Sequence, residues 1–362
     1  MGLNEEHSTT VAKIVAEELG EEMEAWLAAS GVSPDATVRA VIAPHAGFRY
    51  SGRCAAYAFA HMHAPSIRRI FLLGPSHHHY TRKCVLPRST SFHTPLGALP
   101  IDMQVVEELK ATGEFEEMGR HVDEAEHSLE MHAPFLAHMC KDHNVSLVPI
   151  MVGSLDAAAE ARYGSILSRY FSDSSNFFSI SSDFCHWGSR FRFTPYDKAH
   201  GPIHKAIEAM DREGMAAIEG GGAKAFRDYI ERTGNTVCGR HPIGVLLQVW
   251  RERGWMGWKV AGLDGRVEGG GLGWVDGCWA GSRGVGLGRG VLPVFSPSTT
   301  HSPFSAPHSP LRSPSPPQMA ELCPSPPSIR FVQYEQSSHC HSMRDSSVSY
   351  ASAVLTLTPP ST

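Results

Sequence analysis

The sequence lacks the features that mark several large classes of protein. Lysine and arginine together number 32 against 37 aspartates and glutamates, and no basic stripe or patch interrupts this slight acidic excess. A surface for nucleic acid or for an anionic membrane is therefore not expected. No apolar run is long enough to span a bilayer. Residues 1–7 also lack the positive start and apolar core of a signal peptide. These absences predict a soluble, cytoplasmic protein, with the nucleus not excluded.

Cysteine is present but not paired in the sequence. The chain has eight cysteines, at 54, 84, 140, 185, 238, 278, 323 and 340, and no CxxC motif. Scattered cysteines in a reducing compartment are typical of buried thiols rather than disulfides. Cys238 is a different case, because it lies in a Gly/Pro-containing turn before a predicted helix. A helix N-terminus lowers a thiol pKa and favours the thiolate, which is the form that binds metals.

Short apolar runs alternate with segments of helical periodicity. Four runs, Val38–Ala43, Arg69–Leu73, Ser146–Val152 and 177–182, are closed by glycine, proline or polar residues and read as buried parallel strands. The predicted helices cover 11–27, 54–60, 103–111, 155–171, 203–210, 223–231 and 241–250. This alternation is typical of an α/β fold, a three-layer domain with a mostly parallel central sheet.

The composition changes abruptly near Trp255. Residues 254–290 are rich in glycine, and residues 291–328 are dominated by serine and proline. Such a segment buries too little apolar surface to offset the entropy of ordering it. We therefore predict one α/β domain formed by 1–254 and 329–362, interrupted by a long disordered insert at 255–328. Lys259-Val260 is also the translation of an unspliced AAG-GT donor, so the segment is interpreted as retained intron sequence or, alternatively, as a genuine insertion.

Three of the predicted strands run directly into polar clusters that contain histidine. His45 follows the first strand, His77 follows the second, and Asp183 and His186 follow the strand at 177–182. The carboxyl ends of parallel strands meet at one edge of a sheet, so these four side chains should converge on one crevice. Each has a simpler structural interpretation, such as a hydrogen-bonded core histidine or an aspartate that caps a helix. Together they favour a metal site.

Two further groups of polar residues are candidates for the same crevice. His127, Glu130 and His132 lie close together in the sequence, and His127 and Glu130 share one face if the segment is helical. Cys238 could contribute a thiolate. Two imidazoles and one thiolate suit zinc, copper or iron, and the order of affinities alone would favour copper.

Five motifs resemble the hallmark segments of the Memo family, whose fold is similar to the LigB-type (class III) extradiol dioxygenases. They occur in the family's order, and the resemblance covers roughly 20–254 and returns at 329–355. The motifs are Ala43-Pro-His45-Ala-Gly, Leu73-Gly-Pro-Ser-His77-His78, Glu126-His127-Ser-Leu-Glu130-Met-His132, Ser181-Ser-Asp183-Phe-Cys-His186-Trp-Gly and Val237-Cys238-Gly-Arg-His-Pro-Ile-Gly244. The family usually opens with an Ala-Gly-x-Trp-Tyr segment, which is not found in residues 1–10. We interpret its absence as a sign that the start of the sequence is truncated or mispredicted.

The resemblance implies one metal ion held by His45, His77 and Cys238, with Asp183 and His186 beside it. In this reading His186 is a catalytic acid or base, and Asp183 is a catalytic residue that orients a histidine or a bound water. The resemblance implies iron, as Fe2+, as the first expectation, with copper second and zinc third. The related dioxygenases use a carboxylate where this chain has Cys238, so their ring-cleaving activity is not carried over.

The leading hypothesis is a Memo-type metal-binding protein with redox or oxygen-related activity on an unknown small molecule. The alternative is a non-catalytic module that binds a protein or phosphopeptide partner in the same crevice. Its rim would be formed by Trp187, Arg190, Arg192 and Tyr196. A zinc hydrolase is a third reading, because two histidines and a cysteine with an open position also activate water. Whether the protein is an enzyme is left open by the sequence.

Overall fold

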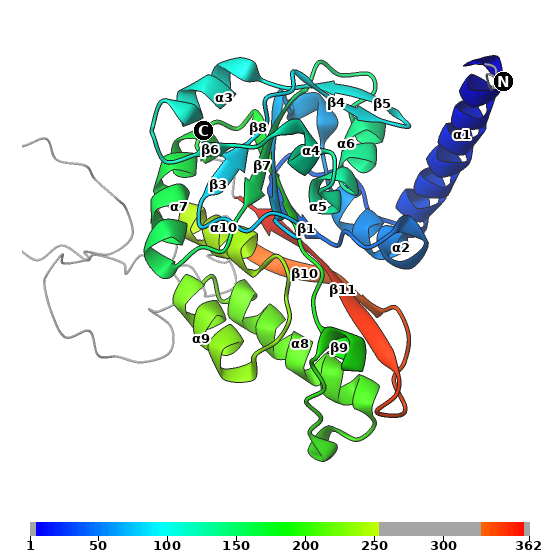
Figure 1. Ribbon diagram of the computed structural model, residues 1–362, viewed down its shortest axis with the longest axis vertical. Coiled ribbons are helices and arrows are strands. Elements are labelled where there is room, and N and C mark those ends of the chain that lie inside the picture. Colours follow the sequence, from blue (N-terminus) through cyan, green and yellow to red (C-terminus); the bar gives the residue numbers. More distant parts are fainter. Residues whose placement is uncertain (1–4, 253–326, 358–362) are drawn as a thin grey trace, which may run out of the picture. The chain divides into compact units, whose positions relative to one another are not determined.

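The computed structural model describes residues 5–252 and 327–357 (Figure 1). The predicted insert, 255–328, lies outside the described residues except for its last two positions. The helices are α1 Glu5–Ala29, α2 Phe48–Phe59, α3 Met103–Lys110, α4 Arg120–Asp123, α5 His127–Glu130, α6 Ala133–Met139, α7 Ala157–Phe171, α8 Ile203–Glu219, α9 Ala223–Thr233 and α10 Arg240–Glu252. Short 3-10 turns cover Ala64–Ser66, Ser189–Phe191 and Lys198–His200.

The strands form one large sheet and a separate hairpin. They are β1 Val38–Ala43, β2 Arg69–Pro75, β3 Cys84–Leu86, β4 Ser91–Thr94, β5 Gly97–Pro100, β6 Glu116–Glu117, β7 Ser146–Val152, β8 Asn176–Ser181, β9 His186–Gly188, β10 Ser328–Gln336 and β11 Ser346–Thr356. The large sheet has the order β10-β11-β1-β8-β2-β7-β3-β6, with β9 paired to β11, and β4 pairs with β5.

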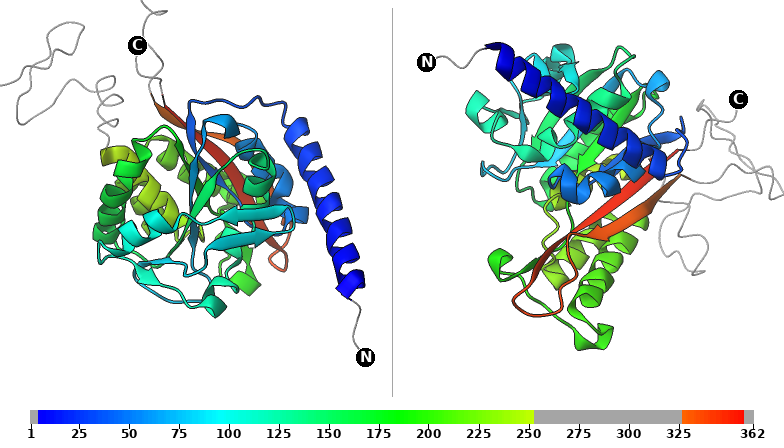
Figure 2. Two further views of the ribbon diagram at one scale, coloured as in Figure 1. Left: turned by 90° about the horizontal axis from the view of Figure 1, so that it is seen from above. Right: turned by 90° about the vertical axis from the view of Figure 1, so that its right-hand side faces the viewer.

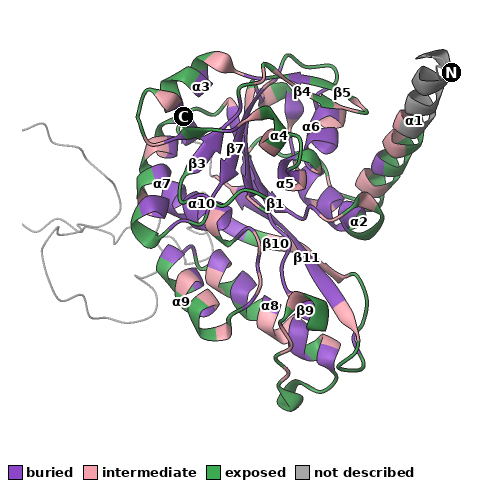
Figure 3. Ribbon diagram, in the orientation of Figure 1, coloured by how far each residue is buried: buried purple, intermediate pink, exposed green. Residues whose placement is uncertain are grey.

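The centre of the large sheet is parallel, as the apolar runs predict. Strands β1, β8, β2 and β7 pair in parallel registers, for example Ile42 with Ile180 and Leu72 with Ser179. Their side chains are almost all buried on both faces (Figure 3). Continuous burial is the reason that these strands read as unbroken apolar runs rather than as alternating patterns.

The C-terminal segment completes the sheet on the side of β1. Strand β11 pairs antiparallel with β1, from the pair of Val38 with Thr356 to the pair of Ile42 with Ala353. Strand β10 in turn pairs antiparallel with β11. Residues 328–336 and 346–356 are therefore part of the same sheet as residues 38–43, although the predicted insert separates them in the sequence. The boundaries that we predict for the insert itself stay a prediction.

Helices cover both faces of the sheet, which confirms the three-layer α/β class (Figure 2). Alternate residues of each strand point to opposite faces. Phe71, Val148 and Ile42 pack into one apolar cluster with residues of α3, α7, α8, α9 and α10. Leu72, Leu147 and Val41 pack into a second cluster with α2 and α6.

Some elements differ from their predicted bounds for local reasons. Helix α2 begins at Phe48 rather than at Cys54, because Gly47 provides its N-cap directly after the polar segment that contains His45. Helix α8 continues beyond Met210 to Glu219, and Gly214 lies in close contact with the ring of Tyr229. The short strands between 84 and 117 have no periodicity long enough to be predicted. In the described ranges, no helix combines the length and apolarity needed to cross a membrane.

A buried carboxyl group joins α8 to the C-terminal strands. Asp211 is fully buried and accepts hydrogen bonds from Asn235 Nδ2 (2.9 Å) and Tyr334 Oη (3.0 Å). Burial raises the pKa of Asp211 to about 6, although these hydrogen bonds oppose the shift. The folded protein thus holds this proton more tightly than the unfolded chain, in which the ordinary value is 3.8.

We predict that Asp211→Asn reduces the pH dependence of stability in mildly acidic solution. Because the folded pKa is raised, the stabilisation from Asp211 is complete below about 3.8 and is lost as the pH rises through about 6. Asparagine can donate and accept as a protonated aspartate does, but it does not titrate. The free energy of unfolding in urea, measured at pH 4.5 and 7.5 for both proteins, should fall more with pH in the wild type. An equal change in the two proteins would contradict this account.

Candidate metal centre

The carboxyl ends of three adjacent strands bring the predicted site residues together. His45 lies two residues beyond β1, His77 two residues beyond β2 and Asp183 two residues beyond β8. Strand β8 pairs with both β1 and β2, so all three side chains lie at one edge of the sheet. Asp183 Oδ1 accepts hydrogen bonds from the main-chain N–H groups of His45 (2.8 Å) and Ala46 (3.3 Å). This aspartate fixes the backbone of the His45 segment.

Three imidazole rings form the centre of the site. In the described part of the chain, His45, His77 and His127 form a group in which one ligand nitrogen from each ring lies within 4.8 Å of the others. The ring centroids are 5.2 Å apart for His45 and His77, and 4.4 Å apart for His77 and His127. Burial, followed by the neighbouring His77, lowers the pKa of both His45 and His127. Neutral imidazole is the form that binds a metal.

The hydrogen bonds of His45 select the ring nitrogen that is free for a metal. His45 Nδ1 lies 2.7 Å from Ser181 Oγ, and the Ser181 hydroxyl donates its only proton to the carbonyl oxygen of Ser128 at 2.7 Å. Ser181 Oγ must therefore accept from His45, so Nδ1 carries the proton. The lone pair of His45 is on Nε2.

His77 is held in the same tautomer by a carboxylate. Glu126 Oε1 accepts from His77 Nδ1 at 2.8 Å, and Glu126 Oε2 accepts from the main-chain N–H of His77 at 2.7 Å. Burial alone would raise the pKa of Glu126, but these bonds and one from Ser128 N–H hold it at about 2. Glu126 is thus an ionised acceptor, and Nε2 of His77 is the nitrogen left for a metal.

The sequence prediction gives no role to Glu126 and names His127 only as a candidate for the crevice, not as a ligand. Glu126 is the N-cap of the short helix α5, where its side chain accepts from Ser128 N–H, and His127 is the first residue of that helix. An acidic N-cap directly before a histidine is a local signal that could have found both. His132 of the same motif is structural: it is fully buried, and its ring bonds Ser179 Oγ and the carbonyl oxygen of Ala43, with the pKa lowered to about 4, chiefly by burial.

Cys238 lies beside the imidazole cluster, but in a protonation state that the sequence does not predict. Its Sγ is 3.2 Å from His45 Nε2 and accepts from the main-chain N–H of Asp183, also at 3.2 Å. Burial, followed by the charge of Asp183, raises the pKa of Cys238 well above its ordinary value. The expectation that the N-terminus of α10 would lower the pKa of this thiol is therefore wrong. The thiol can donate to the free lone pair of His45.

The two predicted catalytic residues differ in their surroundings. Asp183 is buried, which raises its pKa, and its Oδ2 is 4.0 Å from His45 Nε2. His186 is half-buried at the start of β9, and its Nδ1 donates to the carbonyl oxygens of Phe184 (2.9 Å) and Thr236 (3.0 Å). Its Nε2 is thus the nitrogen able to exchange a proton.

The aromatic rim expected for a partner-binding groove is not formed as predicted. Trp187 is fully buried, and its Nε1 donates to the carbonyl oxygen of Pro195 at 2.8 Å. The guanidinium group of Arg190 stacks over the ring of its neighbour Phe191. Trp187 therefore packs in the core and cannot line an exposed groove.

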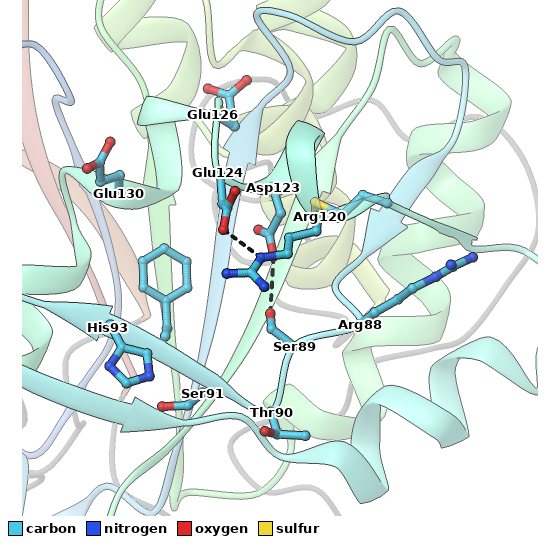
Figure 4. A pocket seen from close by; sticks show the side chains of 12 residues that line it. Arg88, Ser89, Thr90, Ser91, His93, Arg120, Asp123, Glu124, Glu126 and Glu130 are labelled. Atoms are coloured by element: carbon cyan, nitrogen blue, oxygen red, sulfur yellow. Dashed lines mark hydrogen bonds and ion pairs between the residues drawn. The ribbon is translucent and has the colours of Figure 1, made fainter.

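A cavity of about 640 Å³ lies beside Glu126 (Figure 4). Glu126 connects the cavity to the histidine cluster, because it lines the cavity and holds His77. Arg120 points toward Glu124 and Ser89 toward Asp123, so these charges are partly paired within the wall. The lining includes four carboxylates and two guanidinium groups: Asp123, Glu124, Glu126, Glu130, Arg88 and Arg120.

Comparison with known proteins agrees with the motifs that surround this site. Residues 11–263 match the model of the family described as Memo-like protein. The chain belongs to the Memo family. Protein MEMO1 of Danio rerio is 46% identical over 237 residues, which cover 65% of this chain and 80% of that protein.

Other Memo proteins have similar identity. Protein MEMO1 of Homo sapiens is 40% identical over 237 residues, with the same shares of the two chains, and Protein memo-1 homolog of Caenorhabditis elegans is 44% identical over 232 residues, covering 64% of this chain and 66% of that protein. The uncharacterized protein JW3007 from Escherichia coli K12 is 15% identical, with a TM-score of 0.39, covering 59% of this chain and 89% of that chain. That score is too low to indicate a shared fold.

We predict that Glu126→Gln weakens metal binding without removing any of the candidate ligands. A glutamine side chain has one carbonyl oxygen in place of two acceptors, so it cannot hold both Nδ1 and the main-chain N–H of His77. Loss of such a carboxylate typically costs 10- to 100-fold in metal affinity. Titration of both proteins with Fe2+ and Cu2+ under anaerobic conditions would measure the change in metal affinity. Glu130→Gln is the matched control, because Glu130 is exposed and lines the same cavity; an equal loss there would contradict the role of Glu126.

Proposed function

We propose that this Memo protein binds a single iron or copper ion at the histidine cluster and uses it in redox or oxygen-related chemistry. The convergence of His45, His77 and His127, with the Nδ1 atoms of His45 and His77 both engaged as donors, carries the proposal. The residues fit such an ion, because imidazole suits iron, copper and zinc. Fe2+ is the first expectation from the resemblance, copper is the second and zinc the third.

The third ligand is either Cys238 or His127. The resemblance implies His45, His77 and Cys238, and the contact of 3.2 Å between Cys238 Sγ and His45 Nε2 supports that set. His127 supports the alternative, because it completes the group of three imidazoles. The choice matters chemically, since a thiolate is a soft donor that favours Cu(I) and shifts the redox potential, whereas a third imidazole does neither.

When bound, iron or copper would supply one-electron redox chemistry. The chain's own residues would position the metal-binding histidines and exchange protons with a substrate. Asp183 holds the backbone of His45, and Ser181 and Glu126 hold the tautomers of His45 and His77. His186 keeps one ring nitrogen free to give a proton to a substrate or take one from it. The binding of metal by Cys238 requires loss of the thiol proton, so metal uptake through this residue should release a proton.

We predict that Cys238→Ser and His127→Ala separate the two ligand sets. Both variants keep His45 and His77, so the true third ligand is the one whose loss abolishes most bound metal. If Cys238 is the third ligand, Co2+ bound to the wild type should give a thiolate charge-transfer band that disappears in Cys238→Ser; if His127 is, the wild type should give no such band. Metal analysis of protein purified without added metal, followed by Co2+ spectra, would measure this. Full metal content in both variants, and in His45→Ala, would overturn the proposed site.

We predict that His186→Ala keeps the metal and reduces oxygen-dependent turnover about 100-fold, the lower range for a lost acid or base. Oxygen uptake with a panel of catechols and thiols, compared at equal metal occupancy, is the measurement. Loss of metal together with activity would instead make His186 a ligand. If the metal-loaded wild type consumes no oxygen and undergoes no redox cycling, the enzyme proposal fails.

Partner binding is the second candidate function, and the cavity lined by Glu126 is the observation that favours it. The carboxylate of Glu126 is buried against His77, but Asp123, Glu124 and Glu130 still outnumber the two guanidinium groups in the wall, and Arg120 is already paired with Glu124. Such a lining suits a basic or neutral polar segment better than a phosphorylated one. If partner binding is the function, it should persist in a variant that no longer binds metal, such as His45→Ala.

A further inference from the structure

A second group of histidines lies at the loop between β10 and β11, where it meets the first turn of α8 (Figure 1). The ring of His204, the second residue of α8, stacks on the ring of His339 with centroids 4.6 Å apart. The ring of His341 meets His204 edge-on at 5.1 Å. His339 and His341 are exposed, and His204 is half-buried. None of the three takes part in the site described above.

The backbone of the loop directs His339 and His341 to the same side. Cys340, between them, is fully buried in a small apolar cluster with Trp187, Ile203 and Ile207. The histidines on either side of it are exposed, and both of their rings contact the ring of His204. The two exposed rings therefore lie over the same turn of α8.

His204 presents a free ring nitrogen to this surface. The carbonyl oxygen of Cys340 accepts from the main-chain N–H of His204 at 3.2 Å and lies 3.4 Å from its Nδ1. A carbonyl oxygen can only accept, so Nδ1 carries the proton and Nε2 carries the lone pair. An Nδ1–H bonded to a main-chain carbonyl is also the usual support of a metal-binding histidine.

The backbone that carries the three rings is held by hydrogen bonds. Asp345 Oδ2 accepts from the main-chain N–H groups of His341 and Ser342, both at 2.8 Å. Gln336 Nε2 donates to the carbonyl oxygen of His204 at 3.0 Å. The three rings are in contact, but their nitrogens do not converge, since among the described residues only His45, His77 and His127 have ligand atoms within 4.8 Å of one another. An ion bound here therefore requires the exposed rings of His339 and His341 to turn toward Nε2 of His204.

We propose that His204, His339 and His341 form a second metal site, which takes a divalent transition ion such as Zn2+, Ni2+ or Cu2+. Three imidazoles with an open fourth position are an established ligand set for such ions. The sulfur of Cys340 is buried on the opposite side, so the site offers nitrogen ligands alone. An ion held there would join the β10–β11 loop to α8 and restrain the loop. This proposal is independent of the ion at His45 and His77.

Tryptic cleavage after Arg344 tests the proposal without reference to the first site. Arg344 is an exposed residue of the same loop, and an ion that binds only the closed loop lowers its open population by the factor 1 + [Zn2+]/Kd. In the full chain, Zn2+ at ten times its Kd should slow this cleavage about tenfold. Cys238→Ser should leave the protection intact, whatever happens to the metal at the first site.

The variants H339Q/H341Q and His204→Gln should remove the protection, whereas H121Q/H143Q, in which two exposed histidines of other segments are replaced, should retain it. The number of Zn2+ ions bound at equilibrium should fall by one in H339Q/H341Q relative to the control. Protection that persists in H339Q/H341Q, or an unchanged number of bound ions, would overturn the proposal. Cleavage in the wild type that Zn2+ does not slow would overturn it equally.

Discussion

The parallel pairing of β1, β8 and β2 is the constraint on which the candidate metal centre depends. These strands are distant in the sequence, yet β8 lies between the other two, and all three end at the same edge. His45, His77 and Asp183 are each two residues beyond a strand end, so the register of the sheet determines their separation. A slip of one residue in either pairing would turn the side chains of that strand to the opposite face and break up the cluster.

The polar groups that hold the two histidines, Ser181, Ser128 and Glu126, are buried, so each needs a hydrogen-bond partner. Ser128 connects the two histidines: its main-chain N–H bonds Glu126, which holds His77, and its carbonyl oxygen accepts from Ser181, which holds His45. Gly74 allows α5 to approach β2 this closely, because a Cβ atom there would lie 2.6 Å from Ser128 Oγ. At Gly239 a Cβ atom would lie 2.3 Å from the Cβ of Ser182, so glycine lets the segment of Cys238 reach the end of β8.

The sequence alone predicts the strand framework because that framework depends on local composition. Val38–Ala43 and Ser146–Val152 are strands with the predicted bounds, and the convergence of His45, His77 and Asp183 follows from strand polarity. Glu126 and His127 could not be placed in the same way, since α4 and α5 have four residues each and leave no periodic pattern. The protonation of Cys238 was predicted wrongly because burial outweighs the effect of a helix N-terminus.

The two histidine groups show how burial determines what a metal site requires. At His45 the ring is buried and its tautomer is set by Ser181, so little side-chain entropy is lost when an ion binds. At His339 and His341 the rings are exposed and must be ordered by the ion itself. The pairing of His204 with Cys340 joins residues 136 positions apart, and no local pattern indicates it. A preorganised centre suits an ion that must be held in one geometry for chemistry, whereas an exposed one suits an ion that fastens a loop to a helix.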